Sequence, residues 1–264
     1  MPLRISTRPA LPSSESRASL RDRIVSVIFA PFRRVKGYGP SGAIRNVRLG
    51  TILSVSLATV LSVSVSRASA EPVVIAALGD SLTQGYGLPP EDGFVPQLQS
   101  WLDGQGAEVR LVNAGVSGDT SAGGLSRVGW TLTDDVDGLI VALGGNDLLR
   151  GIDPAVTRAN LDGILAAAEA QGVPVLLVGM DAPSNYGADY EAAFDAIYPE
   201  LAEEWGTLFA PDFLGALAAL EDRASTLNDY MQPDAVHPNA AGVAKIVEDL
   251  GPHVMQLAAR AGGG

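Results

Sequence analysis

Short runs of apolar residues alternate with amphipathic stretches along residues 71–264. Each run is only four to six residues long and is rich in leucine and β-branched residues. Continuous apolar runs of this length are typical of strands that are buried on both faces of a parallel sheet. The sequence therefore predicts four strands and a weaker fifth, at Val73–Leu78, Val109–Val112, Leu139–Leu143, Val175–Val178 and Thr207–Ala210.

Apolar residues recur at helical spacing between and after these runs. The last such stretch covers Val243–Leu257, and a similar pattern covers Tyr190–Trp205. This spacing places the apolar residues on one face of a helix, where they can pack against a sheet. Asp153 is suited to an N-cap and Pro154 to a first helical turn, so a further helix is predicted from there to about Ala170.

The alternation of strands and helices predicts the fold class of residues 71–264. Predicted strands and helices alternate along the chain, which is typical of a doubly wound α/β domain with about five parallel strands. The segment contains no internal sequence repeat and no linker. In such folds, ligands bind at the carboxyl ends of the strands. Chemistry is therefore expected in the loops directly after four positions: Leu78, Val112, Leu143 and Val178.

Charged residues divide the chain into two parts that meet near residue 70. Residues 1–70 contain 11 Lys or Arg and 2 Asp or Glu, a net charge of +9, whereas residues 71–264 contain the remaining 7 Lys or Arg and 28 Asp or Glu, a net charge of −21. So acidic a part is unsuited to phosphate contacts, and no nucleic-acid partner is expected. Asp134, Asp135 and Asp137 match no complete calcium loop and predict a solvated surface.

Residues 1–70 have the features of an N-terminal extension that ends in a secretory signal peptide. A basic segment precedes the apolar segment Ile52–Val65, and the small-x-small pattern of a cleavage site follows at Ala68–Ala70. This order of segments is typical of a secretory leader. We therefore expect cleavage after Ala70 and a periplasmic or secreted domain of residues 71–264, without stable insertion in a membrane.

Two alternatives remain for this leader. Segment 51–66 could be kept as a membrane anchor, although it is shorter than the roughly 20 apolar residues of a span and contains several serines. The region before it is also longer than the basic region of an ordinary leader. Either translation starts downstream of Met1, or residues 1–45 are an unusual extension.

The first predicted strand leads directly into the sequence GDSLT at residues 79–83. A serine at a strand end, two residues after a glycine, can lie in a tight turn with its hydroxyl group exposed. By itself, Ser81 is better explained as a turn or helix N-cap residue. The chain contains no cysteine, which excludes a cysteine nucleophile, a disulfide and a thiolate metal site.

The loops after the second and third predicted strands each contain two glycines. In NAGVSGDTS at residues 113–121, Gly115 and Gly118 allow backbone N–H groups to approach a ligand. In GGND at residues 144–147, the side-chain amide of Asn146 can donate a hydrogen bond to a developing oxyanion. Either sequence also fits an ordinary loop. Neither a P-loop nor a GxGxxG sequence is present, so nucleotide binding has no support.

The chain has two histidines, His237 and His253. His253 falls within the last predicted helix and is expected at the surface. His237 precedes that helix in the sequence DAVHP and follows Asp234 by three positions. In a turn these two side chains can meet, so that the aspartate holds one imidazole nitrogen while the other accepts a proton from a serine. A plain turn capped by Asp234 is the alternative.

These four blocks, in this order, resemble the SGNH hydrolases, also called the GDSL esterase/lipase family. The resemblance covers nearly all of residues 71–260. The segments GYGL, VNAGVSGDTSAGGLSR, GGNDLLRG, NYG and IYPELA are similar to the branch of bacterial arylesterases, acyl-CoA thioesterases and lysophospholipases. The resemblance implies a three-layer α/β/α, flavodoxin-like fold with a five-stranded parallel sheet, and a mechanism without a metal or an organic cofactor.

The resemblance also implies a role for each candidate residue. Ser81 is the expected nucleophile, His237 the general base and then the acid for the leaving group, and Asp234 the residue that orients His237. The oxyanion hole is expected to consist of the backbone N–H groups of Ser81 and Gly118 and the side-chain amide of Asn146. Three further aspartates on family positions are expected to brace loops rather than to react: Asp80, Asp119 and Asp147.

The activity that the resemblance implies is hydrolysis of carboxylic esters with short to medium acyl chains, including aryl esters, and of thioesters or lysophospholipids. The net charge of −21 on residues 71–264 disfavours polyanionic substrates, so a small neutral ester is the expected partner. Leu148, Leu149 and Tyr186 are candidates for an acyl groove. The alternatives are a carbohydrate O-deacetylase and a non-catalytic binding protein, which would not need the five candidate residues together.

Overall fold

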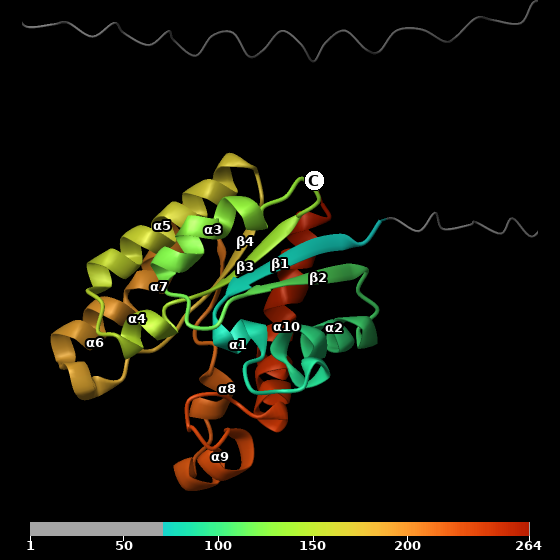
Figure 1. Ribbon diagram of the computed structural model, residues 1–264. Coiled ribbons are helices and arrows are strands. Elements are labelled where there is room, and N and C mark those ends of the chain that lie inside the picture. The colour runs from blue at the N-terminus through green and yellow to red at the C-terminus, as the bar shows by residue number, and fades with distance from the viewer. Residues whose placement is uncertain (1–70, 264) are drawn as a thin grey trace, which may run out of the picture. The chain divides into compact units, whose positions relative to one another are not determined.

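The computed structural model describes residues 71–263, and the predicted leader lies outside the described residues. Five parallel strands form one sheet in the order β2-β1-β3-β4-β5 (Figure 1). Their bounds are Val73–Gly79 for β1, Val109–Gly115 for β2, Gly138–Ala142 for β3, Val175–Val178 for β4 and Leu208–Ala210 for β5. The predicted α/β class with five parallel strands is confirmed.

Helices connect the strands and cover both faces of the sheet. The helices before β4 are α1 (Ser81–Gln84), α2 (Phe94–Gly104), α3 (Ser121–Thr131), α4 (Gly145–Leu149) and α5 (Pro154–Ala170). Those after β4 are α6 (Ala188–Asp195), α7 (Ile197–Trp205), α8 (Gly215–Ala218), α9 (Arg223–Tyr230) and α10 (Ala240–Ala261). Two short 3-10 helices, η1 (Pro90–Asp92) and η2 (Ser184–Tyr186), lie in loops.

Alternate side chains of each strand enter two separate hydrophobic cores. In β1, Val74, Ala76 and Leu78 pack into the core beneath α3, α5 and α7. Ile75 and Ala77 point the other way and pack into the core beneath α2 and α10. Figure 1 shows these helices as two layers on either side of the sheet. Burial on both faces explains why β1, β3 and β4 are apolar throughout rather than alternating.

Strand β2 is longer than its apolar run predicts. The run ends at Val112, but pairing with β1 continues through Asn113 opposite Ala77 to Gly115 opposite Gly79. Backbone hydrogen bonds to the neighbouring strand hold this polar and glycine-containing end in the sheet. The extension carries the loop that follows β2 to the same edge as the loop that follows β1.

The apolar pattern over Tyr190–Trp205 forms two helices instead of one. Helix α6 ends at Asp195 and α7 begins at Ile197. Pro199 has no N–H to donate to the carbonyl of Asp195 four residues earlier, and its ring crowds that carbonyl. Proline is tolerated in the first turn of α7, so the break falls just before it.

The other predicted helices agree closely with the structure. Helix α5 begins at Pro154, and the side chain of its N-cap residue Asp153 accepts a hydrogen bond from the N–H of Ala155. Helix α10 carries the predicted apolar face. His253 on α10 is partly buried, not fully at the surface as predicted. Between residues 71 and 263, no helix combines the length and apolar character that a membrane span requires.

The acidic run before β3 lies at the surface, as predicted. Asp134, Asp135 and Asp137 are all exposed. Asp135 forms an ion pair with Arg110, and Asp137 accepts a hydrogen bond from the N–H of Val74 at the start of β1. These contacts attach the α3–β3 loop to neighbouring strands, so the carboxylates have structural partners.

Candidate active site

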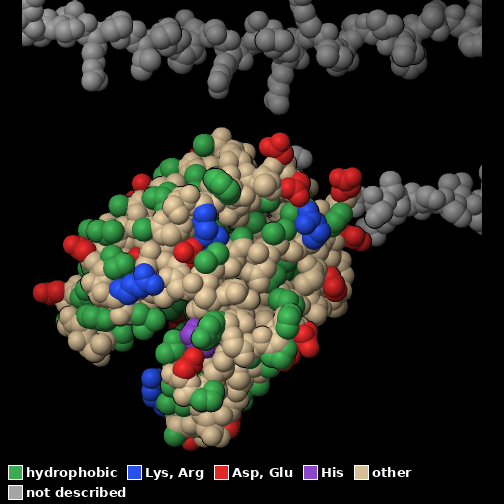
Figure 2. Space-filling view, viewed as in Figure 1, with side chains coloured by type: hydrophobic (Ala, Val, Ile, Leu, Met, Phe, Trp, Pro, Cys, Tyr) green, Lys and Arg blue, Asp and Glu red, His purple; other side chains and the backbone are tan. Residues whose placement is uncertain are grey.

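The carboxyl ends of β1, β2 and β3 bring the candidate residues together. Ser81 is the first residue of α1, directly after β1, and Gly118 lies in the loop after β2. Asn146 is in α4 after β3, whereas Asp234 and His237 lie in the loop between α9 and α10. All five line one cavity of about 500 Å³. Figure 2 shows this face of the molecule hollowed between the lobe with α4 and α6 and the lobe with α8 and α9.

Ser81, His237 and Asp234 form a continuous series of hydrogen bonds. The Oγ of Ser81 lies 2.9 Å from Nε2 of His237, and Nδ1 of His237 lies 2.7 Å from Oδ2 of Asp234. Because the aspartate accepts from Nδ1, the proton of a neutral imidazole resides there and Nε2 faces the serine as an acceptor. The arrangement can remove the hydroxyl proton of Ser81.

Backbone contacts hold the loop that carries Asp234 and His237. Oδ1 of Asp234 accepts hydrogen bonds from the N–H groups of Val236 and His237, each at 3.0 Å. The N–H of Gln232 donates to the carbonyl of His237 across the loop. Ala235 at the tip has a φ of +57°, a left-handed conformation that the tight turn requires. The hydrogen bonds from the backbone and side chain of His237 lower the pKa of Asp234 to about 2, so this carboxylate is ionised near neutral pH.

Asp80 connects the serine turn to the loop after β3. Its Oδ1 accepts from the N–H of Leu82 and caps α1, and its Oδ2 accepts from Nδ2 of Asn146 at 3.2 Å. The side chain is buried, and this burial raises the pKa of Asp80 to about 6 against the opposing effect of its hydrogen bonds. Asp80 therefore fixes the orientation of the Asn146 amide.

Three hydrogen-bond donors meet at the cavity. Within residues 71–263, the backbone N–H groups of Ser81 and Gly118 donate to no other group of the protein. Asn146 uses one of its two side-chain N–H groups for Asp80 and retains the other. Gly118 has a φ of +83°, a backbone conformation that glycine adopts readily and other residues rarely adopt. This conformation sets the direction of its N–H group. Such donors can stabilise an oxyanion.

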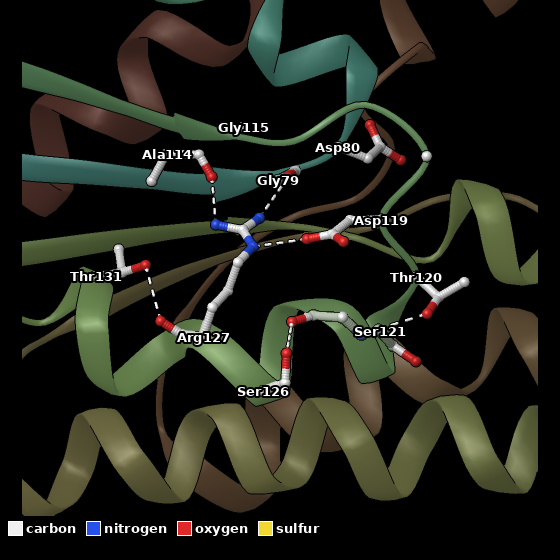
Figure 3. A network of polar contacts seen from close by, with 12 residues as sticks. Gly79, Asp80, Ala114, Gly115, Asp119, Thr120, Ser121, Ser126, Arg127 and Thr131 are labelled. Atoms are coloured by element: carbon white, nitrogen blue, oxygen red, sulfur yellow. Dashed lines mark hydrogen bonds and ion pairs between the residues drawn. The ribbon is translucent and has the colours of Figure 1, made fainter.

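Arg127 on α3 holds the ends of β1 and β2 together (Figure 3). Its Nη2 donates to the carbonyl of Gly79 and its Nη1 to the carbonyl of Ala114, at 2.8 and 2.6 Å. Its Nε forms an ion pair with Asp119, one residue after Gly118. One guanidinium group thus fixes the serine turn and the Gly118 loop relative to each other.

Asp147 attaches the segment after β3 to helices α3 and α5. Its fully buried carboxylate accepts hydrogen bonds from the N–H and hydroxyl group of Ser121 at the start of α3. The hydroxyl group of Thr157 on α5 is a third donor, at 3.1 Å. The carboxylates of Asp80, Asp119 and Asp147 therefore all hold their segments to groups of nearby helices, which agrees with the bracing predicted for them. No three His, Cys, Asp or Glu side chains gather for a metal ion in the described part of the chain.

Sequence reasoning missed two residues at this site. Arg127 was not identified because its carbonyl partners are far away in sequence, although it is one of only seven basic residues after position 70. Tyr86 was also missed, and its ring lies with its centroid 4.8 Å from that of His237. The three residues expected in an acyl groove, Leu148, Leu149 and Tyr186, do line the cavity.

Comparison with known proteins establishes the family. The model of the GDSL-like Lipase/Acylhydrolase family matches residues 77–245. Esterase TesA of Pseudomonas aeruginosa is 37% identical over 192 residues, which cover 72% of this chain and 91% of the relative. The Thioesterase 1/protease 1/lysophospholipase L1 of Escherichia coli K12 is 36% identical over 173 residues, which cover 65% of this chain and 77% of the relative.

A solved structure is similar over the same region. The crystal structure of AlinE4, described as an SGNH-hydrolase family esterase, is 44% identical with a TM-score of 0.58, and the match covers 71% of this chain and 97% of that chain. The fold and the comparisons define a hydrolase that acts on ester bonds. The chain belongs to the GDSL-like lipase/acylhydrolase family, also called the SGNH hydrolases.

Proposed function

We propose that the protein is a serine esterase in which Ser81, His237 and Asp234 are the catalytic triad. The observation that carries this proposal is the continuous series of hydrogen bonds from the hydroxyl group of Ser81 through His237 to Asp234. A serine hydroxyl is a weak nucleophile until an adjacent base takes its proton. Here the base lies within hydrogen-bond distance, and an ionised carboxylate orients it.

The first half-reaction transfers the acyl group to Ser81. Its Oγ attacks the ester carbonyl while Nε2 of His237 accepts the hydroxyl proton, and the carbonyl oxygen becomes the oxyanion of a tetrahedral intermediate. The C–O bond to the alcohol then breaks, and His237 donates its proton to the departing oxygen. Asp234 stays ionised throughout and stabilises the imidazolium that forms between the two proton transfers.

The oxyanion is stabilised by the N–H groups of Ser81 and Gly118 and by the side-chain amide of Asn146. These donors are fixed before the reaction by Asp80 and by the Arg127 contacts, so little reorganisation accompanies the appearance of charge. In the second half-reaction, water replaces the alcohol. His237 takes a proton from it, the hydroxide attacks the acyl-serine, and Ser81 regains its proton as the acid is released.

The cavity walls favour an apolar acyl chain. Leu148 and Leu149 of α4 and Tyr186 of η2 contribute side chains to the cavity, together with Met180 after β4. Their apolar surface supports carboxylic esters of short to medium chain length, including aryl esters, as the substrate class. Thioesters and lysophospholipids are further candidates, in line with the name of the relative from E. coli.

The function is tested with aryl esters of increasing acyl length, acyl-CoA thioesters and acetylated sugars, each measured with wild type and Ser81→Ala. We expect turnover of the esters by wild type and a loss of several orders of magnitude in the variant. Preferential turnover of acetylated sugars would instead identify a carbohydrate O-deacetylase. A failure to hydrolyse any of these substrates would favour the binding-protein alternative and contradict the proposal.

Export is part of the proposed function. The basic and apolar segments of residues 1–70 and the Ala68–Ala70 pattern support a leader that is cleaved after Ala70, so that residues 71–264 act in the periplasm or outside the cell. In that location, a small-molecule ester is the proposed partner. The N-terminal sequence of the mature protein tests this proposal: a chain that begins at Glu71 is expected, and one that retains segment 51–66 would identify an anchor instead.

A further inference from the structure

The alcohol part of an ester must lie beside the imidazole ring of His237. In the proposed reaction, Nε2 of His237 donates its proton to the departing alcohol oxygen, which requires the two atoms to be about 2.6–3.2 Å apart. The oxyanion points instead toward the donors of Ser81, Gly118 and Asn146. The residues around His237 therefore decide which alcohol fits.

The ring of Tyr86 lies beside His237, Val236 is the residue before His237, and both side chains line the cavity. The ring of Tyr86 lies with its centroid 4.8 Å from that of His237, at an interplanar angle of 41°. Tyr86 is 52% exposed and Val236 is 42% exposed, so both present apolar surface that a bound group could cover. Covering such surface is favourable, and a flat ring can also stack on the tyrosine.

The backbone at this position is fixed independently of the tyrosine ring. Nε2 of Gln232 donates to the carbonyl of Tyr86 at 2.8 Å and to the carbonyl of Pro238 at 3.0 Å. The same residue donates its backbone N–H to the carbonyl of His237. Gln232 thus joins the segment of Tyr86 to the histidine loop, and a change in the ring leaves these contacts in place.

The charges around His237 select against an anionic alcohol. Asp234 is ionised and partly exposed in the cavity wall, and Asp80 is the other carboxyl group that acts on His237. Among residues 71–263, no lysine or arginine lines this cavity, and Arg150 outside it donates to the carbonyl of Gly118. A phosphate-bearing alcohol, such as the one that a lysophospholipid releases, would meet this negative charge, so neutral esters are expected to be better substrates than the lysophospholipid candidates.

We propose that Tyr86, Val236 and the edge of His237 form a leaving-group subsite for a neutral, apolar alcohol that contains a ring. This subsite rests on the proposed function, because it assumes that His237 protonates the alcohol. It is separate from the acyl-binding wall of α4 and η2. Its ligand class is the phenols and cycloalkanols of simple esters, in preference to small alkanols.

The test compares the butyrate esters of ethanol, cyclohexanol and phenol, which share one acyl group. Ethanol and cyclohexanol are similarly poor leaving groups, and their intrinsic difference in reactivity is the same for every variant, so the change in the ratio of their kcat/KM values between wild type and a variant reports the contact with the ring. We expect wild type to favour cyclohexyl over ethyl butyrate. Tyr86→Ala should lower this ratio by about 2- to 12-fold, because the apolar surface that covers the cyclohexyl ring is lost, whereas Tyr86→Phe should retain it.

The control is Tyr186→Leu, which alters the acyl-binding wall. It should change the dependence on acyl length and leave the alcohol ratio as in wild type. An equal ratio in wild type and Tyr86→Ala, or no preference for the ring in wild type, would overturn the subsite. Unchanged hydrolysis of all three esters by Ser81→Ala would contradict the proposed function instead, so the two failures are distinguishable.

Discussion

The side-chain amide of Asn146 donates a hydrogen bond to the buried carboxyl group of Asp80, at 3.2 Å. An ionised carboxylate only accepts hydrogen bonds, so the nitrogen of the amide must face Asp80. The second N–H of Asn146 then remains for the substrate. This contact joins the loops after β1 and β3, and it explains how an asparagine on a five-residue helix can be held as a donor.

Replacing Asn146 tests its proposed role at the oxyanion. Asn146→Ala should lower kcat by about 10²–10³-fold with little change in KM, because the lost hydrogen bond strengthens only as charge develops. Steady-state kinetics with an aryl ester measures both constants, and thermal unfolding shows whether the fold is kept. A folded variant with the kcat of wild type would contradict the role.

Asp80 should make the folded protein less stable as the pH rises, the opposite of the effect of a carboxyl group whose pKa is lowered by folding. Its pKa is about 6 in the folded protein against 3.8 ordinarily, so the folded state binds the proton more tightly than the unfolded state. The free energy of unfolding should therefore fall by roughly 3 kcal/mol as the pH rises from about 4 to above 6. Asp80→Asn should remove this contribution.

Denaturant unfolding of wild type and Asp80→Asn across this pH range checks the prediction. Asp212, whose pKa burial also raises to about 6, contributes a parallel decrease that remains in the variant, and Asp212→Asn is the matched control. Asp234 acts in the opposite direction and at lower pH, since its pKa is about 2: its contribution is lost as the pH falls below about 4. A stability difference between wild type and Asp80→Asn that is constant from pH 4 to 7 would refute the account.

Replacing Arg127 should lower the free energy of unfolding more than replacing Arg110, which also forms an ion pair. Arg127→Met removes an ion pair and two bonds to carbonyls, and should cost about 2–3 kcal/mol and lower kcat because the Gly118 loop loses its support. Arg110→Met is the control, because its ion pair with Asp135 is exposed and worth about 0–1 kcal/mol. Equal losses of stability in the two variants would contradict the assigned role of Arg127.

Two buried threonines, Thr83 and Thr157, should differ in how their replacement by valine changes the free energy of unfolding. Thr83 is buried beside the serine turn, and its hydroxyl group has no hydrogen-bond partner among residues 71–263. Thr83→Val should therefore be neutral or stabilising. The hydroxyl group of Thr157 donates to buried Asp147, so Thr157→Val should cost about 1–3 kcal/mol. Thermal unfolding of both variants tests this difference, and a larger loss for Thr83→Val would be the contradicting result.

The sequence predicts where most strands of the sheet lie because the central strands are buried on both faces and are therefore continuous apolar runs. Runs such as Val175–Val178 have no other stable location, and the strand found there has these same bounds. The end of β2 was missed because Asn113–Gly115 are held by pairing with β1, which local sequence does not express. The break before α7 was missed because apolar spacing alone ignores the backbone effect of Pro199.

The sequence indicates where the candidate site residues lie, but it does not reveal the contacts that hold these residues in place. Ser81, Gly118 and Asn146 follow predicted strands, so the topology places them at one edge of the sheet. Helices α1 and α4 are too short for a periodic pattern. The side chain of Asp80 caps α1, whereas α4 is held by the contacts of Asn146 and Asp147 with neighbouring segments. The contacts of Arg127 and Tyr86 join segments far apart along the chain, and only the folded structure reveals them.

The most direct test of the central claim is covalent labelling by a fluorophosphonate probe, followed by mass spectrometry of the intact protein and its peptides. An activated serine should take up one equivalent of label, located on Ser81. Ser81→Ala should remain unlabelled, and His237→Ala should react far more slowly while keeping its fold. A folded wild-type protein that takes up no label, or that is labelled on a different serine, would contradict the assignment of Ser81 as the nucleophile.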